Sequence, residues 1–222
     1  MERNKINNLR PGSKHYMAYV GPPKKYEAVG KMQFDFLIAA GLQKDSKLLD
    51  IGCGSLRAGL HFIPYLNEAC YFGLEPNKWL VDEGIKQNLT ESIVNEKQPL
   101  FEYNSNFDLS GFNSNFDFVI AQSIFSHASQ SQIKQCLSEV NSTLNKNGLF
   151  LATFVLGKAN YEGDEWVYPA CVRYTESHIK KMIEETGLKC LKSNWPQGVG
   201  QTWFVIYKEG NQLAESVANI KT

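Results

Sequence analysis

"LLDIGCGSLRAG", residues 48–59, joins an apolar run to two closely spaced glycines. Its apolar beginning predicts a short buried strand, which we place at 47–51. A strand does not need glycine and a helix is weakened by it, so Gly52 and Gly54 predict a tight turn that a ligand approaches closely. Taken alone, the pair also fits a plain structural turn, and the rest of the chain has to decide between the two interpretations.

Segments with the period of a strand alternate with segments with the period of a helix along the chain. Such alternation implies parallel strands joined by right-handed crossovers, hence an α/β fold with a doubly wound, mostly parallel sheet. Strands are predicted at 47–51, 70–75, 100–104, 116–122, 148–155 and 201–209, and helices at 26–41, 55–66, 80–90, 131–145 and 176–188. We expect one domain over 1–222, made of an N-terminal lid segment and helix (1–45), a Rossmann-like core (46–208) and a C-terminal tail (209–222).

The composition disfavours several classes of partner. Lys and Arg together number 23, as do Asp and Glu, so the formal net charge is zero and the pI is about 6.9. Such a chain has no overall positive field to attract nucleic acid or an anionic membrane. The five cysteines form no CxxC pair and no His, Asp and Glu cluster has metal-ligand spacing, so no metal is expected. Without an apolar signal segment at its start, we expect a cytoplasmic monomer or homodimer.

The turn after the first strand lies where doubly wound sheets bind their ligands, at the carboxyl ends of the strands. Its glycines leave room for a ribose and an amino-acid moiety, and Asp50 can accept hydrogen bonds from an ammonium group or from loop amides. Glu75 ends the second predicted strand, close to the roughly 20-residue offset at which an acidic residue binds ribose hydroxyls. A dinucleotide fingerprint needs a third glycine where this chain has Arg57. The pattern therefore favours a zwitterionic nucleoside.

With "LLDIGCGS" as the first motif and Glu75 as the ribose-binding acid, the chain resembles the class I S-adenosylmethionine-dependent methyltransferases over 47–208. The resemblance implies a Rossmann-like, three-layer α/β/α fold with a seven-stranded sheet and helices on both faces. It also implies S-adenosyl-L-methionine as the cofactor and S-adenosyl-L-homocysteine as its product. "HYMAYVGPP", "GLEPNKWL", "WVYP" and "GQTWFV" are most similar to bacterial enzymes that methylate small molecules, including sugars and natural products.

The resemblance places further residues around the cofactor. Pro76 and Asn77 border the adenine, and so do Phe107 and Asp108, although Asp108 fits a turn cap equally well. Many methyltransferases of nucleobases and glutamine carry Asn-Pro-Pro-Tyr at the methionine end, whereas this chain has Ala-Gln-Ser-Ile at 121–124, which disfavours DNA, RNA and amide substrates. The predicted cofactor-binding residues are Asp50, Gly52, Cys53, Gly54, Ser55, Arg57, Glu75, Pro76, Asn77, Phe107, Asp108, Gln122 and Ser123.

His127 is the candidate catalytic residue. An unperturbed imidazole can take a proton from a hydroxyl near neutral pH, so His127 fits a general base. The alternative is a histidine that is only hydrogen-bonded at a helix start. Cys53 precedes a helix, a position that activates thiols, but a small residue between two glycines is the commoner reason for a cysteine there.

Three aromatic-rich segments, at 14–23, 160–174 and 194–204, are predicted to build the acceptor site. Flat aromatic faces suit sugar rings and other small organic groups, although each aromatic residue taken singly also fits a plug at the end of the core. The predicted acceptor residues are His15, Tyr16, Tyr19, Tyr161, Trp166, Tyr168, Arg173, Trp195 and Trp203. The segment 14–23 is further predicted to be a lid over the cleft, with a strap across the sheet edge as the alternative.

The sequence therefore predicts a methyltransferase of the EC 2.1.1 type. It would move a methyl group to an oxygen, less readily to a nitrogen, of a small-molecule acceptor such as a sugar or natural product. Two alternatives come from other classes. One is a non-catalytic module that binds the nucleoside, and the other is a nicotinamide-dependent oxidoreductase, which Arg57 disfavours.

Overall fold

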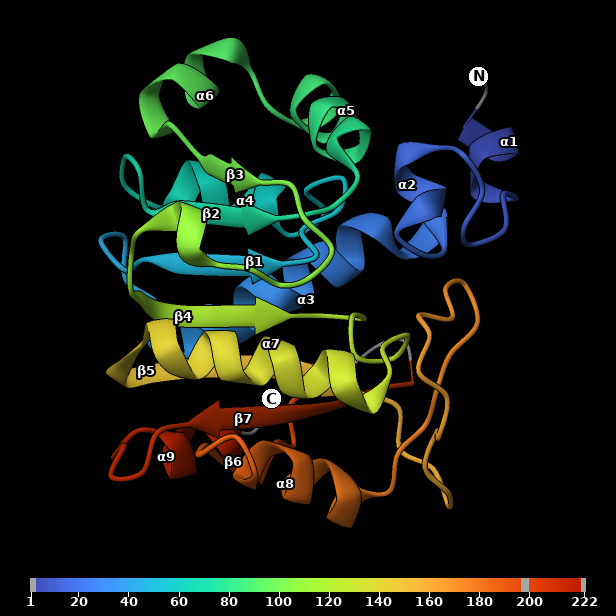
Figure 1. The fold of residues 1–222 in the computed structure, drawn as a ribbon. Coiled ribbons are helices and arrows are strands. Elements are labelled where there is room, and N and C mark those ends of the chain that lie inside the picture. Colours follow the sequence, from blue (N-terminus) through green and yellow to red (C-terminus); the bar gives the residue numbers. More distant parts are fainter. Residues whose placement is uncertain (1–2, 197–199, 221–222) are drawn as a thin grey trace.

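Within residues 3–196 and 200–220, which the computed structural model describes, a seven-stranded sheet carries helices on both faces (Figure 1). The strands are β1 (Leu48–Ile51), β2 (Tyr71–Leu74), β3 (Leu100–Glu102), β4 (Phe116–Ala121), β5 (Leu144–Phe154), β6 (Lys189–Lys192) and β7 (Thr202–Tyr207). The helices are α1 (Arg3–Asn7), α2 (Tyr16–Tyr19), α3 (Tyr26–Ala39), α4 (Gly59–Tyr65), α5 (Lys78–Asn88), α6 (Glu91–Lys97), α7 (Gln130–Thr143), α8 (Glu176–Glu184) and α9 (Ala214–Ala218). Short 3-10 turns lie at Pro23–Lys25 and Ser110–Phe112.

The order of the strands across the sheet is β3-β2-β1-β4-β5-β7-β6, and it reverses between β1 and β4. β1 pairs in parallel with β2 and β4, β4 pairs in parallel with β5, and β7 runs antiparallel to both β5 and β6. Ligands of such sheets bind outside the carboxyl ends of the strands at the reversal point. The architecture confirms the predicted α/β class and places the loops after β1, β2 and β4 at the expected site.

The two faces of the sheet build two apolar layers, because successive side chains of a strand point to opposite faces. Leu49 and Val119 pack in the layer that contains the buried residues of α7 and α8. Leu48 and Ile120 pack in the layer that contains those of α3, α4 and α9. In Figure 1, α7 lies in front of the sheet and α3 lies behind it, which gives the predicted three layers.

Short elements without an apolar stripe were missed by the sequence analysis. β6 is a four-residue strand at the sheet edge with a lysine at each end, and α6 buries no side chain. The segment 209–222, predicted as a tail, contains α9, which buries Ala214, Val217 and Ala218 against the sheet. These elements are held by packing on neighbours, which periodicity within one short segment does not reveal.

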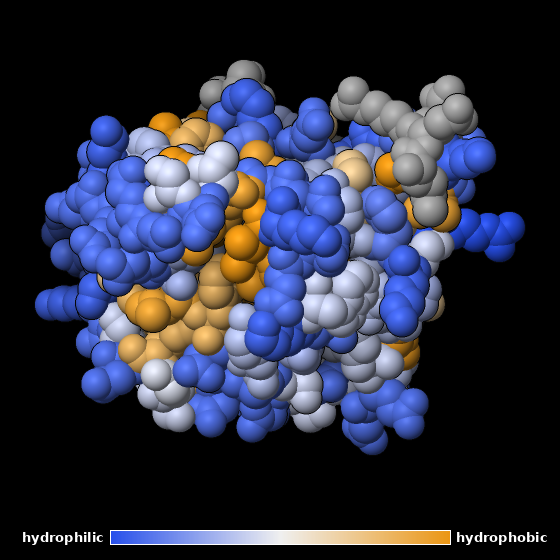
Figure 2. All heavy atoms as spheres, turned by 90° about the horizontal axis from the view of Figure 1, so that it is seen from above, coloured by the Kyte–Doolittle hydropathy of each residue, from blue (hydrophilic) through white to orange (hydrophobic). Residues whose placement is uncertain are grey.

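The other sheet edge, β3, exposes apolar side chains. Leu100 is 44% exposed and Tyr103 is 40% exposed. Figure 2 looks onto the end of the molecule that carries α5 and α6, and it shows an apolar area among hydrophilic side chains. Among the described residues, no helix is long and apolar enough to cross a membrane.

Candidate functional site

The loop after β1 has a backbone that glycine makes possible. Gly52 and Gly54 have φ values of +68° and +55°, in the left-handed region that other residues avoid. A Cβ on Gly52 would lie 2.0 Å from Cδ1 of Ile124, and one on Gly54 would lie 2.6 Å from Cγ1 of Val20. The two glycines therefore form a cradle over which Ile124 and Val20 pack closely.

Glu75, at the end of β2, binds this loop directly. The backbone N–H of Gly54 donates to its Oε2 at 3.1 Å, and the backbone and side-chain amides of Asn77 donate to its Oε1 at 2.9 and 2.8 Å. Burial raises the pKa of Glu75, and the bonds from Asn77 and Gly54 oppose that rise. Each carboxylate oxygen has lone pairs left for a further donor, so the position fits ribose hydroxyls.

Asp50 lies beneath the loop rather than at its surface. It is 4% exposed, and the hydroxyl of Tyr71 donates to its Oδ2 at 2.8 Å. Burial raises the pKa of Asp50 to about 7, despite that hydrogen bond and the nearby charge of Arg57. Its observed partner is thus a side chain of β2, and its predicted contact with the cofactor stays a prediction.

Cys53 and Ser55 are buried residues of the glycine loop after β1. Cys53 is 5% exposed, and burial raises the pKa of its thiol well above the usual value, which disfavours the nucleophile interpretation. Ser55 is fully buried, and its hydroxyl donates to the backbone carbonyl of Tyr16 at 2.8 Å. It also accepts at its carbonyl from the hydroxyl of Tyr26 at 2.6 Å, so it joins the loop to the N-terminal segment.

The N-terminal segment 16–20 lies on the glycine loop. Besides the bond from Ser55, Nη1 of Arg57 donates to the carbonyl of Val20 at 2.7 Å, and the hydroxyl of Tyr168 donates to the carbonyl of Tyr19. The ring of Tyr19 lies edge-on to Trp79 of α5, with centroids 5.3 Å apart. This placement is the one that a lid requires and not that of a strap on the sheet edge; opening and closing stay a prediction.

Arg57 is the cation at the centre of these contacts. Its Nη2 donates to Oε1 of Gln122 at the end of β4, while its Nε is buried and has no hydrogen-bond partner. Burial lowers the pKa of Arg57. A buried Nε–H without a partner costs free energy, so Arg57 fits a site for a negatively charged group.

A cluster of amides and hydroxyls lies at the ends of β4, β5 and β7. Nε2 of Gln122 donates to the hydroxyl of Ser123, which also accepts from Nε2 of Gln201 at 2.6 Å. The hydroxyl of Thr153 donates to Oε1 of Gln201 and accepts from the backbone N–H of Ser123. Ser123 has a φ of +62°, so strain is stored at this point as well. Thr153 and Gln201 were missed, because isolated polar residues at strand ends form no motif.

His127 follows this cluster and is 7% exposed. Its Nδ1 lies 2.6 Å from the carbonyl oxygen of Ala170, and since a carbonyl only accepts, Nδ1 carries the hydrogen. Burial lowers the pKa of His127, more than the bond to Ala170 raises it, so the ring is neutral near pH 7 with its lone pair on Nε2. No described residue binds Nε2.

The loop 166–173 frames His127. The backbone N–H of Val167 donates to the carbonyl of His127, and that of Val172 donates to the carbonyl of Ser126. The rings of Trp166 and Tyr168 lie 5.6 and 4.9 Å from the imidazole, centroid to centroid. Trp166 and Tyr168, two of the predicted acceptor residues, therefore lie against the candidate base His127.

Other predicted acceptor residues lie elsewhere. Trp203 and Trp195 are corrections: Trp203 is fully buried in β7, and Trp195 stacks on Phe36 of α3, with centroids 4.8 Å apart, against the same apolar layer. The reason is strand alternation, which turns the side chain of Trp203 into the core. Tyr161 and Arg173 bond within their own loop region, to carbonyls of Glu165 and Leu156.

His15 and Tyr16 lie at the start of α2. Nδ1 of His15 accepts from the backbone N–H of Met17 and so caps that short helix, and the rings of His15 and Tyr16 lie 4.9 Å apart. The part of the third aromatic segment at 197–199 lies outside the described residues.

The loop after β3 holds the predicted adenine contacts. Phe107 has a φ of +59° and is 8% exposed, in contact with the apolar layer of α7. Oδ1 of Asp108 accepts from the backbone N–H of Ser110, which favours the turn-cap interpretation. Pro76 is exposed beside Asn77.

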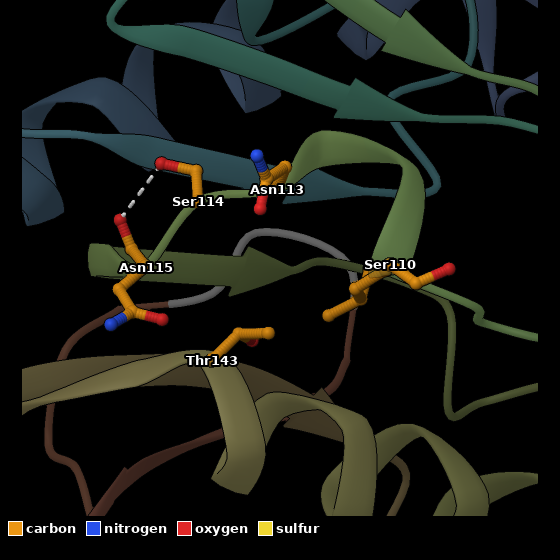
Figure 3. Close-up of a pocket in the computed structure, with 6 residues that line it drawn as sticks. Ser110, Asn113, Ser114, Asn115 and Thr143 are labelled. Carbon is orange, nitrogen blue, oxygen red and sulfur yellow. Dashed lines mark hydrogen bonds between the residues drawn. The ribbon is translucent and has the colours of Figure 1, made fainter.

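A surface cavity of about 400 Å³ lies at the opposite, amino end of the sheet (Figure 3). It is lined by Leu109, Ser110, Asn113, Ser114, Asn115 and Thr143. Its polar side chains are exposed or half-exposed, and the hydroxyl of Ser114 bonds to the neighbouring carbonyl of Asn115. None of the predicted site residues lines it.

Comparisons with known proteins agree with the geometry at the carboxyl end. Residues 49–150 match the family model described as a methyltransferase domain. These residues run from β1 into β5 and contain the glycine loop, Glu75 and His127. The predicted resemblance to class I methyltransferases is thereby confirmed.

Solved structures with the same fold include three methyltransferases. Magnesium protoporphyrin IX methyltransferase from Synechocystis PCC 6803 with bound SAH has a TM-score of 0.63 at 15% identity, over 93% of this chain and 92% of that one. The glycopeptide N-methyltransferase MtfA complexed with S-adenosyl-L-homocysteine has a TM-score of 0.61 at 9% identity, over 82% and 90%. A putative O-methyltransferase from Nostoc punctiforme PCC 73102 has a TM-score of 0.63 at 14% identity, over 87% and 60%. At these identities the likeness establishes the fold.

Proposed function

We propose that the chain is an S-adenosylmethionine-dependent methyltransferase that transfers the methyl group to an oxygen of a small-molecule acceptor. One observation carries the proposal: inside a methyltransferase domain, the glycine loop of β1 is bound by its Gly54 N–H to the Glu75 carboxylate of β2. Backbone room beside an acidic residue at the point where strand order reverses is the arrangement that nucleoside sites use. Structures of the same fold are known with S-adenosylmethionine and S-adenosylhomocysteine bound.

The residues present fit this cofactor. Gly52 and Gly54 leave a cradle in which any Cβ would collide with Ile124 or Val20, and the buried Nε of Arg57 has a hydrogen left to donate. Glu75 would hold the ribose hydroxyls, Arg57 the carboxylate and Gln122 with Ser123 the amino-acid end of the cofactor. Pro76, Asn77, Phe107 and Asp108 would border the adenine.

The cofactor supplies a methyl group already activated by the positive charge of its sulfonium. The chain then has to align the acceptor oxygen with that methyl group and exclude water. The segment 16–20 covers the loop after β1, and His127 presents the lone pair of Nε2 to take the acceptor's proton. The assignment of His127 as base rather than as a structural histidine is part of the proposal.

Oxygen is favoured over nitrogen by what surrounds His127. A hydroxyl loses its proton as it is methylated, so a neutral imidazole nearby is useful to it. Gln122 and Ser123 stand where the Asn-Pro-Pro-Tyr motif would hold a planar amine. The zero formal charge of the chain favours a small acceptor over nucleic acid. A cytoplasmic monomer or homodimer remains our prediction.

Isothermal titration with S-adenosylhomocysteine and with NADH, followed by a turnover assay, tests the proposal. We expect S-adenosylhomocysteine to bind with a micromolar Kd, NADH not to bind, and S-adenosylhomocysteine to accumulate from S-adenosylmethionine when an acceptor is supplied. Binding without turnover across a broad acceptor panel would favour the non-catalytic module. Tighter binding of NADH would favour the oxidoreductase and overturn the proposal.

A further inference from the structure

We infer that the acceptor is an aromatic alcohol: a planar ring that stacks on Trp166 and whose ring hydroxyl gives its proton to Nε2 of His127. This inference rests on the proposed methyltransferase function and names the substrate class of the same site. Among the small-molecule acceptors expected from the sequence, such as a sugar or a natural product, it favours a phenol.

The first support is an exposed aromatic face beside the candidate base. Trp166 is 41% exposed, whereas the other rings near His127 are engaged: Tyr168 lies edge-on to the imidazole at 4.9 Å and against Tyr19 at 5.4 Å. Tyr19 in turn contacts Trp79 of α5. A row of rings therefore runs from α5 to His127 and ends at the indole of Trp166, which is open to solvent. Planar rings gain most from such a face, by offset stacking.

The backbone holds Trp166 in this position. The N–H of Val167 donates to the carbonyl of His127 at 3.0 Å, so the residue next to Trp166 is tied to the residue that carries the imidazole. The ring planes of Trp166 and His127 are inclined at 52°. A ring that stacks on the indole can thus turn its substituent towards the imidazole.

The second support is that no charged group among the described residues contacts His127. Nδ1 of His127 donates to a backbone carbonyl and not to a carboxylate, so within the described part of the chain only that neutral bond raises the basicity of Nε2. Burial lowers the pKa of His127. The titratable group in contact with the ring is Tyr168, whose pKa burial raises to about 12, so it remains neutral. His127 is therefore a weak base.

A weak base removes a proton readily only from an acidic hydroxyl. A phenol such as the tyrosine side chain has a pKa of about 10, whereas water is at about 15.7, close to an aliphatic alcohol. Proton transfer to an unassisted imidazole is far less uphill from the phenol than from a sugar hydroxyl. An amine acceptor, which must first lose a proton from its ammonium form, would be served by a carboxylate, and none binds His127 among the described residues.

The step balances without a further reactant. The acceptor oxygen forms a bond to the methyl carbon while the bond from that carbon to sulfur breaks, and its electron pair stays on the sulfur as a neutral thioether. The hydroxyl proton passes to Nε2 of His127 and leaves to solvent.

The experiment compares three bicyclic acceptors of one carbon skeleton with radiolabelled S-adenosylmethionine: 2-naphthol, decahydro-2-naphthol and decahydro-2-naphthylamine. We expect kcat/KM for the naphthol to exceed that of the saturated alcohol and of the amine by about 100-fold or more. Equal or faster methylation of the saturated alcohol or the amine, or no methylation of any of the three, overturns the inference. The proposed function is tested separately, by calorimetric binding of S-adenosylhomocysteine, and survives such a failure if that ligand binds.

Two variants test the named contacts. Trp166→Leu should raise KM for the naphthol about tenfold with a smaller change in kcat, and Trp166→Phe should restore most of the loss. Leu213→Ala, at another exposed apolar residue, is the control and should change neither constant. His127→Gln should lower kcat about 100-fold and remove the acidic limb of the pH profile, while His61→Gln, on α4, keeps both. An unchanged KM in Trp166→Leu would contradict the stacking.

Discussion

The two ends of the sheet differ in a way that matters for locating the site. The amino end carries a cavity of about 400 Å³, yet its polar side chains face solvent, and the hydroxyl of Ser114 bonds to the neighbouring carbonyl of Asn115 and to the exposed amine of Lys47. At the carboxyl end, Val20 and Ile124 pack onto the glycine loop, and the polar groups are buried and bonded across elements. A hollow lined by solvated side chains costs little free energy of folding, so its presence is weak evidence for a functional site.

Phe107 and Ser123 have positive φ in the loops after β3 and β4, but so has Asn113 in the amino-end cavity. The two ends differ in a buried donor: among the described residues, Nε of Arg57 has no hydrogen-bond partner, and no such atom belongs to a residue that lines the amino-end cavity. Conformations and unmet donors of this kind persist only where the surroundings impose them, and they cluster where ligands bind. We therefore expect the cofactor at the carboxyl end.

Gly52→Val should have the largest effect. A β-branched residue resists the left-handed backbone, and its side chain would collide with Ile124 and fill the cradle. We expect S-adenosylhomocysteine affinity to fall beyond 100-fold in a titration, with a lowered Tm. Ser114→Ala, in the amino-end cavity, is the matched control. A larger loss in Ser114→Ala than in Gly52→Val would reverse the comparison of the two ends.

Removal of residues 1–20 comes next in magnitude. The deletion takes away the carbonyls of Tyr16 and Val20 that Ser55 and Arg57 now bind, and with them the cover over the loop. Most methyl transfer should be lost, while S-adenosylhomocysteine still binds within a few-fold, because the loop and Glu75 remain. Methylation at the parental rate by the truncated chain would show that the segment is no lid.

Glu75→Ala should weaken cofactor binding by about 1–3 kcal/mol, since ribose hydroxyls and the Gly54 N–H lose one acceptor. Glu75→Gln keeps an acceptor for Gly54 and should lose less. If both variants bind S-adenosylhomocysteine as tightly as the parent, the ribose assignment is wrong, even where Tm has fallen through the lost bond to the loop.

The smallest effect concerns pH. The pKa of His127 is lowered by burial, so below about pH 6.5 the unfolded chain takes up a proton that the folded chain does not. The free energy of unfolding should therefore decrease as pH falls from 6.5 through the lowered pKa. In His127→Gln, urea unfolding between pH 5 and 7 should show a shallower decrease. An identical slope in parent and variant would refute the buried neutral imidazole.

The sequence was informative where the site is built from consecutive residues. Gly52, Gly54 and Glu75 belong to short motifs in which adjacent residues determine the backbone conformation. The alternation of strand and helix periods predicts the sheet. The sequence is less informative where the direction of a side chain depends on its position within a strand. It predicts Trp203 in the acceptor site, yet a shift of one position within β7 decides whether a side chain packs in the core or faces the cleft. Thr153 and Gln201 come together from β5 and the loop before β7.

A crystal structure of the complex with S-adenosylhomocysteine tests the proposed cofactor site. We expect ribose hydroxyls within hydrogen-bond distance of the Glu75 carboxylate, the ligand's carboxylate at Arg57, and the side chains of Val20 and Ile124 displaced from the glycine cradle. A ligand seated in the cavity of Ser114 and Asn115, or one at the carboxyl end with its ribose turned away from Glu75, would contradict it.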